Sequence, residues 1–154
     1  MPLLEPEEYI GQAYFFRDLR ERMHMGISTQ ELLAILRHEV LAITKLPMAI
    51  DFMDTELRHT GGFASAMRRL NHYFTPFQSF VMAEAERPEG KFDFRIGLEI
   101  LEKEAEYRAK GATPQGLFLY QFEALCRNRL GYDEGLEAMA QDPLYDETWR
   151  EWIR

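Results

Sequence analysis

The stretch His72–Phe80, HYFTPFQSF, places four aromatic side chains around a Thr-Pro pair. Proline disfavours the α-helical conformation in the residue before it, so a helix that includes Phe74 must end close to that point. Thr75 is then a good N-cap, Pro76 suits the first helical position, and Gln78 at the third position completes a capping box. We therefore expect a helix–helix corner here. We also expect its four rings to pack in the core rather than to bind a ligand.

The same helix-starting pattern recurs at 111–118, GATPQGLF, where Thr113 is the expected N-cap and Pro114 begins a helix. A related start lies at 26–32, GISTQEL, with Ser28 as N-cap and Glu31 in position to complete a capping box. Apolar residues recur between these starts at the three- and four-residue spacing of helices. The expected helices cover residues 7–24, 28–43, 47–60, 63–74, 76–87, 93–110 and 114–130, with short helices after residues 133 and 146.

These patterns predict an all-α fold. We expect a single helical domain over residues 1–154, built as a bundle of about six main helices with one or two short helices at the C-terminal end. A chain of this length buries roughly two-thirds of the surface that it exposes when unfolded. With 46% hydrophobic and 13% aromatic residues, the sequence contains enough apolar material for that core.

Charge and composition weigh against several classes of function. The chain has 26 acidic and 18 basic residues and a formal net charge of −8, which opposes binding to DNA, RNA or anionic lipid. The small basic clusters Arg68–Arg69 and Arg127–Arg129 are expected to pair with glutamates. No apolar run approaches the roughly 18 residues that suggest a membrane span. We therefore expect neither nucleic acid nor membrane as a partner.

The beginning of the chain and its cysteine content indicate a compartment. MPLLEPEEY lacks the basic start, the apolar segment and the cleavage site of a signal peptide. Cys126 is the only cysteine, so no disulfide can form within the chain, which fits a reducing compartment. We expect a soluble, cytoplasmic protein. Cys126 lies in an apolar helical run and is expected to be a small buried hydrophobic residue rather than a nucleophile.

Two Glu-x-x-His pairs, Glu21–His24 and Glu56–His59, lie in the last turns of expected helices. The spacing places both side chains on one helix face, and carboxylate-bridged di-iron bundles use such pairs together with further glutamates. Glu56 and His59 lie on a flank where partial burial requires a partner, and Glu39 is the natural third ligand. A site for iron, manganese or zinc at Glu56, His59 and Glu39 is therefore the alternative hypothesis. The competing explanation is that helix C-termini favour histidine.

The leading hypothesis is a non-catalytic interaction or adaptor protein that self-associates, as a homodimer or with a protein partner. The sequence contains no complete set of catalytic residues and no Gly-rich phosphate loop, whereas it is rich in aromatic residues and methionine. Its end, DETWREWIR, is a short amphipathic helix whose tryptophans suit either the chain's own core or an interface, and we favour the core. A ligand pocket lined by His72, Tyr73 and Tyr120 is a third possibility.

Overall fold

The computed structural model describes residues 3–87 and 93–154, and of the side chain of His24 it describes nothing. These residues form nine α-helices and one short 3₁₀ helix. The elements are α1 (Pro6–Arg22), η1 (Met23–Met25), α2 (Thr29–Glu39), α3 (Leu46–Thr60), α4 (Phe63–Arg69), α5 (Pro76–Glu86), α6 (Phe94–Ala109), α7 (Pro114–Asn128), α8 (Tyr132–Ala140) and α9 (Glu147–Ile153). Because the described residues contain helices and no strand, the prediction of an all-α fold is confirmed.

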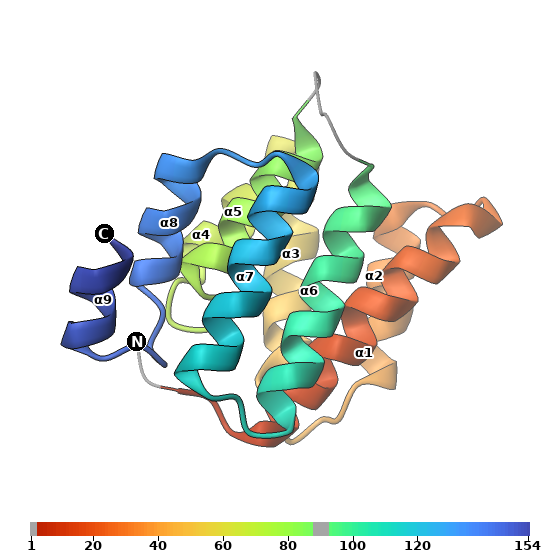
Figure 1. Ribbon diagram of the computed structural model, residues 1–154. Helices are drawn as coiled ribbons and strands as arrows, with labels where there is room; N and C mark the ends of the chain where they lie inside the picture. The colour runs from red at the N-terminus through yellow and green to blue at the C-terminus, as the bar shows by residue number, and fades with distance from the viewer. Residues whose placement is uncertain (1–2, 88–92) are drawn as a thin grey trace.

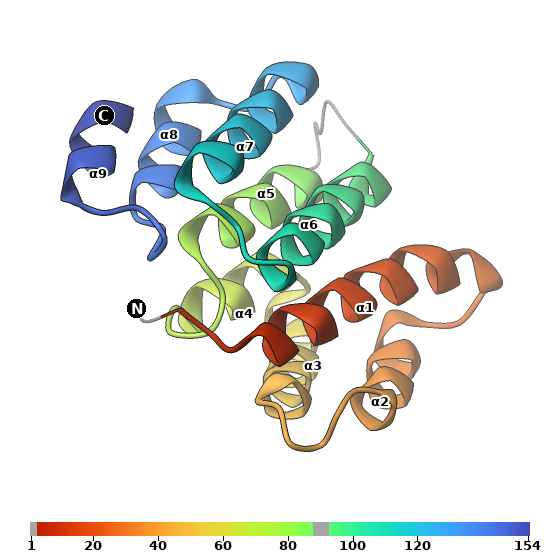
Figure 2. The same cartoon turned by 60° about the horizontal axis from the view of Figure 1, so that its bottom comes forward.

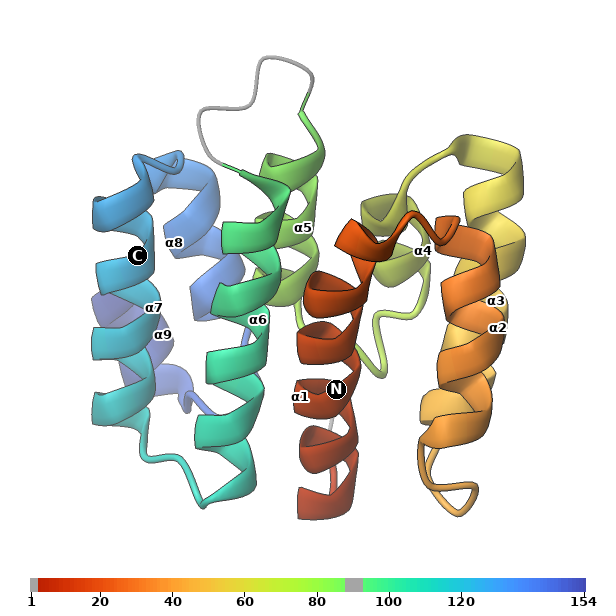
Figure 3. The ribbon, with the colours of Figure 1, turned by 90° about the vertical axis from the view of Figure 1, so that its right-hand side faces the viewer.

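The helices form a middle group with one group on either side of it. α1 packs along α6, and α5 lies against α6 in the same middle group. Figure 3 shows α2, α3 and α4 on one side of this group and α7, α8 and α9 on the other. Figure 2 shows the same order from below. One apolar cluster runs through all three groups, from Phe15 in α1 to Ile153 in α9. The prediction of one domain over residues 1–154 stays a prediction.

The corner at 72–80 forms as expected. Thr75 accepts a hydrogen bond from the backbone N–H of Gln78, and the Gln78 side chain accepts one from the backbone N–H of Thr75, which completes the capping box. The four rings are all buried, so the prediction that they pack in the core is confirmed. These rings are Tyr73, Phe74, Phe77 and Phe80.

Three helix boundaries differ from the expectation. α2 ends at Glu39, so Ile43, which was expected on its apolar face, is 89% exposed in the following loop. α4 ends at Arg69, five residues before Phe74. α7 ends with Arg129 in the left-handed conformation (φ 56°), where Gly131 was expected to end the helix. Other predicted ends are confirmed, among them the left-handed cap at Gly61 (φ 77°). The predicted break at Pro88 and Gly90 lies outside the described residues.

Two helices receive their N-terminal caps from distant parts of the chain. Both carboxylate oxygens of Glu8 in α1 accept hydrogen bonds from the backbone N–H of Lys45, which precedes α3. Glu86 at the end of α5 accepts from the backbone N–H groups of Phe63 and Ala64, which begin α4. A carboxylate at a helix N-terminus satisfies N–H groups that have no partner within the helix. These contacts therefore fix α3 and α4 against the middle group.

Candidate interaction surface

The outer side of α7 carries apolar side chains that are in contact with solvent. Leu119 is 67% exposed and Phe122 is 36% exposed, and Cys126 on the same side is exposed as well. Their spacing of three and four residues places them on one side of the helix. Figure 3 shows α7 at the edge of the molecule, with α9 behind it. α7 therefore presents an apolar stripe to solvent.

Aromatic rings from α8 and α9 extend this stripe. The ring of Phe118 stacks on Phe122 with centroids 5.5 Å apart and meets Trp152 edge to face at 4.9 Å. Trp152 is also 5.5 Å from Trp149, and Tyr132 lies 6.5 Å from Phe122. Trp152 and Tyr132 are more than half exposed. We refer to the following side chains as the aromatic surface: Phe118, Leu119, Phe122, Tyr132, Trp149 and Trp152.

Buried hydrogen bonds hold one end of the aromatic surface in place. The hydroxyl of Tyr145, in the connection between α8 and α9, donates to Gln121 Oε1 of α7 at 2.8 Å. The Tyr145 ring stacks on Trp149 with centroids 5.7 Å apart. Gln121 Nε2 in turn donates to Glu104 Oε2 of α6 at 2.9 Å. Because these groups are buried and bonded in series, they fix the start of α9, and with it Trp149, relative to α7.

Arg108 of α6 completes this buried network. Its Nε donates to Glu104 at 3.1 Å, and its Nη1 and Nη2 donate to the two carboxylate oxygens of Asp142. Burial by itself would lower the pKa of Arg108, but the adjacent carboxylates of Glu104 and Asp142 outweigh it and raise the pKa above its usual value. Asp142 also accepts from the backbone N–H of Leu144 at 3.0 Å. Such mutual satisfaction of buried charges is typical of a structural network.

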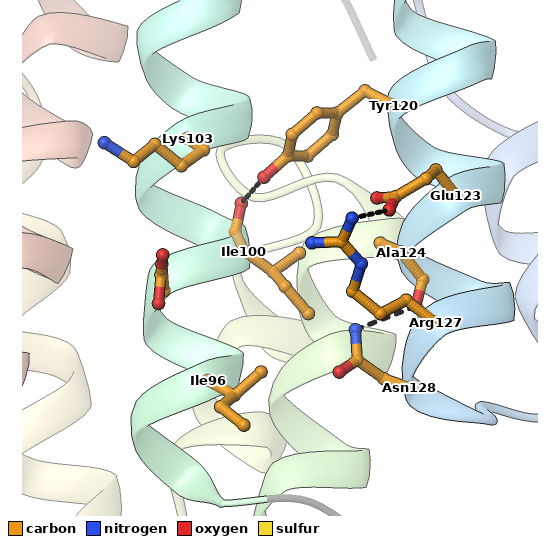
Figure 4. Close-up of a pocket in the computed structure, with 9 residues that line it drawn as sticks. Ile96, Ile100, Lys103, Tyr120, Glu123, Ala124, Arg127 and Asn128 are labelled. Atoms are coloured by element: carbon orange, nitrogen blue, oxygen red, sulfur yellow. Dashed lines mark hydrogen bonds and ion pairs between the residues drawn. The ribbon is translucent and has the colours of Figure 1, made fainter.

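A groove of about 360 Å³ lies between α6 and α7 (Figure 4). The Tyr120 hydroxyl donates to the backbone oxygen of Ile100 at 3.1 Å, and burial raises the pKa of Tyr120. Along the α7 edge, Arg127 and Glu123 form an ion pair at 2.6 Å. The side of α7 that faces α6 therefore carries charged side chains. It lies opposite to the side that faces α9. The remaining lining residues are Ile96, Glu99, Lys103, Ala124 and Asn128.

The three residues proposed as metal ligands lie in different surroundings. Glu56 is buried and binds Arg69 at 2.8 Å, Glu39 is exposed and binds Arg22 at 2.9 Å, and His59 is exposed. Within residues 3–87 and 93–154, no group of three or more His, Cys, Asp or Glu side chains is arranged to hold a metal ion. Metal binding at these residues stays a prediction, and elemental analysis of protein purified without a chelating tag tests it.

The other candidate residues are also dispersed. Tyr73 is buried and its hydroxyl donates to Glu8 at 2.9 Å, His72 is exposed, and Tyr120 lines the groove, which neither of the others does. The prediction that Cys126 is buried was wrong, because it lies on the outer side of α7. None of the helices among the described residues is both long and apolar enough to cross a membrane.

Sequence reasoning missed the buried network, although part of its signal was present. Arg108 follows Glu104 by four residues, which is also the spacing of an ordinary surface ion pair. However, it also follows Ala105 by three residues and Leu101 by seven, and both of these are buried. Arg108 thus occupies the next position of the buried face of α6. Its partner Asp142 lies 34 residues away and carries no such signal.

The chain matches no protein-family model, no curated protein and no solved structure.

Proposed function

We propose that this chain is a non-catalytic interaction protein that self-associates through the aromatic surface. The observation that carries the proposal is the connected series of rings from Trp149 through Trp152, Phe118 and Phe122 to Tyr132, much of it in contact with solvent. Tryptophan and tyrosine are the side chains that contribute most to protein–protein binding, because they bury a large area with few rotatable bonds.

The hydrogen bonds that hold one end of this surface in place support the proposal. The buried network from Arg108 to Tyr145 fixes Trp149, and the helix cap at Asp146, which accepts from the backbone N–H of Trp149 at 2.9 Å, fixes the start of α9. A surface that is already ordered loses less conformational entropy on binding. A connected, exposed apolar patch on a rigid scaffold is typical of an interface.

Sedimentation velocity over a range of protein concentrations tests the proposal. We expect concentration-dependent dimerisation, and we expect Phe122→Ala and Trp152→Ala each to weaken it by about tenfold or more, as removal of a central interface ring does. Ile43→Ala is the matched control, because Ile43 is 89% exposed in the loop between α2 and α3, outside the aromatic surface.

The control variant should dimerise like the unmodified chain. A chain that remains monomeric up to roughly 1 mM, a concentration that populates complexes of even about −4 kcal/mol, contradicts the proposed self-association. Equal weakening by Ile43→Ala and Phe122→Ala would contradict the assignment to the aromatic surface.

A further inference from the structure

The exposed side of α7 has the pattern of a helix-pairing seam. Leu119, Phe122 and Cys126 follow one another at steps of three and then four residues, the spacing of the positions that face a partner helix in a coiled coil. Gln115, in the first turn, and Arg129, which ends the helix in the left-handed conformation, stand at the same spacing in the sequence and are exposed as well. We refer to these five positions as the α7 seam. Because only the middle of the seam is apolar and both ends are polar, a partner helix can contact it over about the length of α7 and no further.

The two flanks of the α7 seam differ in chemistry. On the side of α9 lies Phe118, whose ring contacts Trp152. On the side of α6 lie Glu123 and Arg127, which line the groove and pair with each other (Figure 4). One flank is therefore aromatic, and the other carries one negative and one positive charge. These charges cancel locally, although the chain as a whole has a net charge of −8.

Symmetry decides which orientation of two copies suits these flanks. In a dimer with a two-fold axis, both copies use the same surface. If the two α7 helices run antiparallel, the two-fold axis is perpendicular to them. Each flank of one copy then meets the same flank of the other copy. If they run parallel, the axis lies along them and the charged flank of one copy meets the aromatic flank of the other. The parallel arrangement therefore places Glu123 and Arg127 against apolar rings, which costs free energy of desolvation.

We propose that two copies of this chain pack their α7 seams against each other in antiparallel orientation. The two-fold axis lies near the level of residue 125, so that Glu123 of each copy faces Arg127 of the other. Because the Tyr132 ring lies 6.5 Å from Phe122 and its hydroxyl 3.9 Å from Cys126 Sγ, close to the level of the axis, the same arrangement brings the Tyr132 side chains of the two copies toward each other. The proposal rests on the self-association proposed above, and it adds the identity of the contact helix and its direction.

The single cysteine of the chain reports on this geometry. With the axis at level 125, Cys126 and its counterpart differ by about 3 Å along the helix axis, since a helix rises about 1.5 Å per residue. Packed helices lie roughly 8–10 Å apart, so a short bis-maleimide such as bis(maleimido)ethane can link the two thiols. A cysteine at position 115 would lie about 30 Å from its counterpart in the same dimer, but close to it in a parallel one.

The experiment compares cross-linking of the unmodified chain with that of Cys126→Ser/Gln115→Cys, with Cys126→Ser alone as the blank. We expect linked dimer from the unmodified chain, and no more from the variant with cysteine at 115 than from the blank. Sedimentation velocity on the same samples measures dimerisation, and circular dichroism confirms folding. Efficient linking through position 115 would establish a parallel seam and overturn the proposal.

Charge exchange gives a second readout. Glu123→Lys places two cations opposite each other at both symmetric contacts, and we expect it to weaken the dimer about tenfold. Adding Arg127→Glu restores opposite charges across the antiparallel contact, and we expect the affinity to return. If the double variant dimerises no better than Glu123→Lys, the proposed axis is wrong. A dimer that forms without linking at Cys126 overturns the antiparallel seam and leaves self-association standing, whereas a monomeric chain overturns both.

Discussion

The aromatic residues of the corner at 72–80 and those of the aromatic surface start from similar sequence patterns and end in opposite environments. Phe77 and Phe80 follow the Thr-Pro helix start at Thr75, Phe118 and Phe122 follow the one at Thr113, and in each pair the two rings are neighbours. Yet Phe77 is fully buried, whereas Phe122 is 36% exposed. The difference shows that local sequence places a ring on a helix face, and that the packing of other helices decides whether water reaches it.

The position of α8 accounts for the difference. Gly135 of α8 lies so close to α5 and α7 that a Cβ atom there would be 2.6 Å from a side-chain atom of Leu125 and 3.3 Å from the ring of Phe80. α8 thus covers the corner ring Phe80 and the inner side of α7. The outer side of α7 remains at the edge of the molecule (Figure 3). The aromatic residues of α5 are therefore buried in the core, whereas those of α7 are partly exposed.

The largest expected effect compares one ring from each set. Phe77→Ala should lower the free energy of unfolding by about 3–5 kcal/mol, because a buried ring leaves a cavity when it is removed. Phe122→Ala should lower it by less than about 1 kcal/mol. Urea denaturation followed by circular dichroism measures both, at dilute protein so that association contributes little. Equal losses for the two variants would show that the aromatic surface is part of the core.

The parts of the fold that follow from local chemistry were predictable. Thr75, Thr113, Ser28 and Asp146 cap the helices that their sequences indicate, because an N-cap depends on residues within one helical turn. The left-handed end at Gly61 is local for the same reason.

The contacts between distant residues were not predictable from the same patterns. Glu8 caps the start of α3 across 37 residues, and Arg108 binds Asp142 across 34. Periodicity assigns a residue to a helix face, but it does not say which face another helix will cover. For this reason the burial of Cys126 was wrongly predicted. For the same reason the sequence did not indicate that Trp149 is half-buried whereas Trp152 is exposed. The identity of the candidate surface likewise required the arrangement of α7, α8 and α9.

A smaller effect is expected from the network beneath the aromatic surface. Tyr145→Phe retains the ring that stacks on Trp149 but removes the hydroxyl that donates to Gln121 Oε1. A buried acceptor without its donor costs about 1–3 kcal/mol, so the free energy of unfolding should fall by that amount. Tyr132→Phe is the matched control on the exposed side and should stay within about 0.5 kcal/mol. Urea denaturation measures both variants, and an unchanged Tyr145→Phe would contradict a supporting role for the network.

The smallest effect distinguishes the two environments by the ionisation of tyrosine. Burial raises the pKa of Tyr73 in the corner and of Tyr145 in the network above the ordinary value of 10.0, whereas hydrogen bonds from Thr113 lower the pKa of half-buried Tyr107. Below about pH 10 the folded and unfolded chains both keep the buried phenol protons, so these groups do not change the free energy of unfolding with pH. Above it only the unfolded chain loses them, and the free energy of unfolding falls as pH rises.

Ultraviolet absorbance of tyrosinate, recorded together with circular dichroism during an alkaline titration, measures this sequence of events. Tyr107 should ionise while the helices are intact, and Tyr107→Phe should remove that early step. Tyr73 and Tyr145 should ionise only with the loss of helical structure, since their phenolate forms are unfavourable without water. If all tyrosines ionised together in a fully helical protein, solvent would reach Tyr73 in the corner and Tyr145 in the network as easily as Tyr107, and the contrast between these environments would fail.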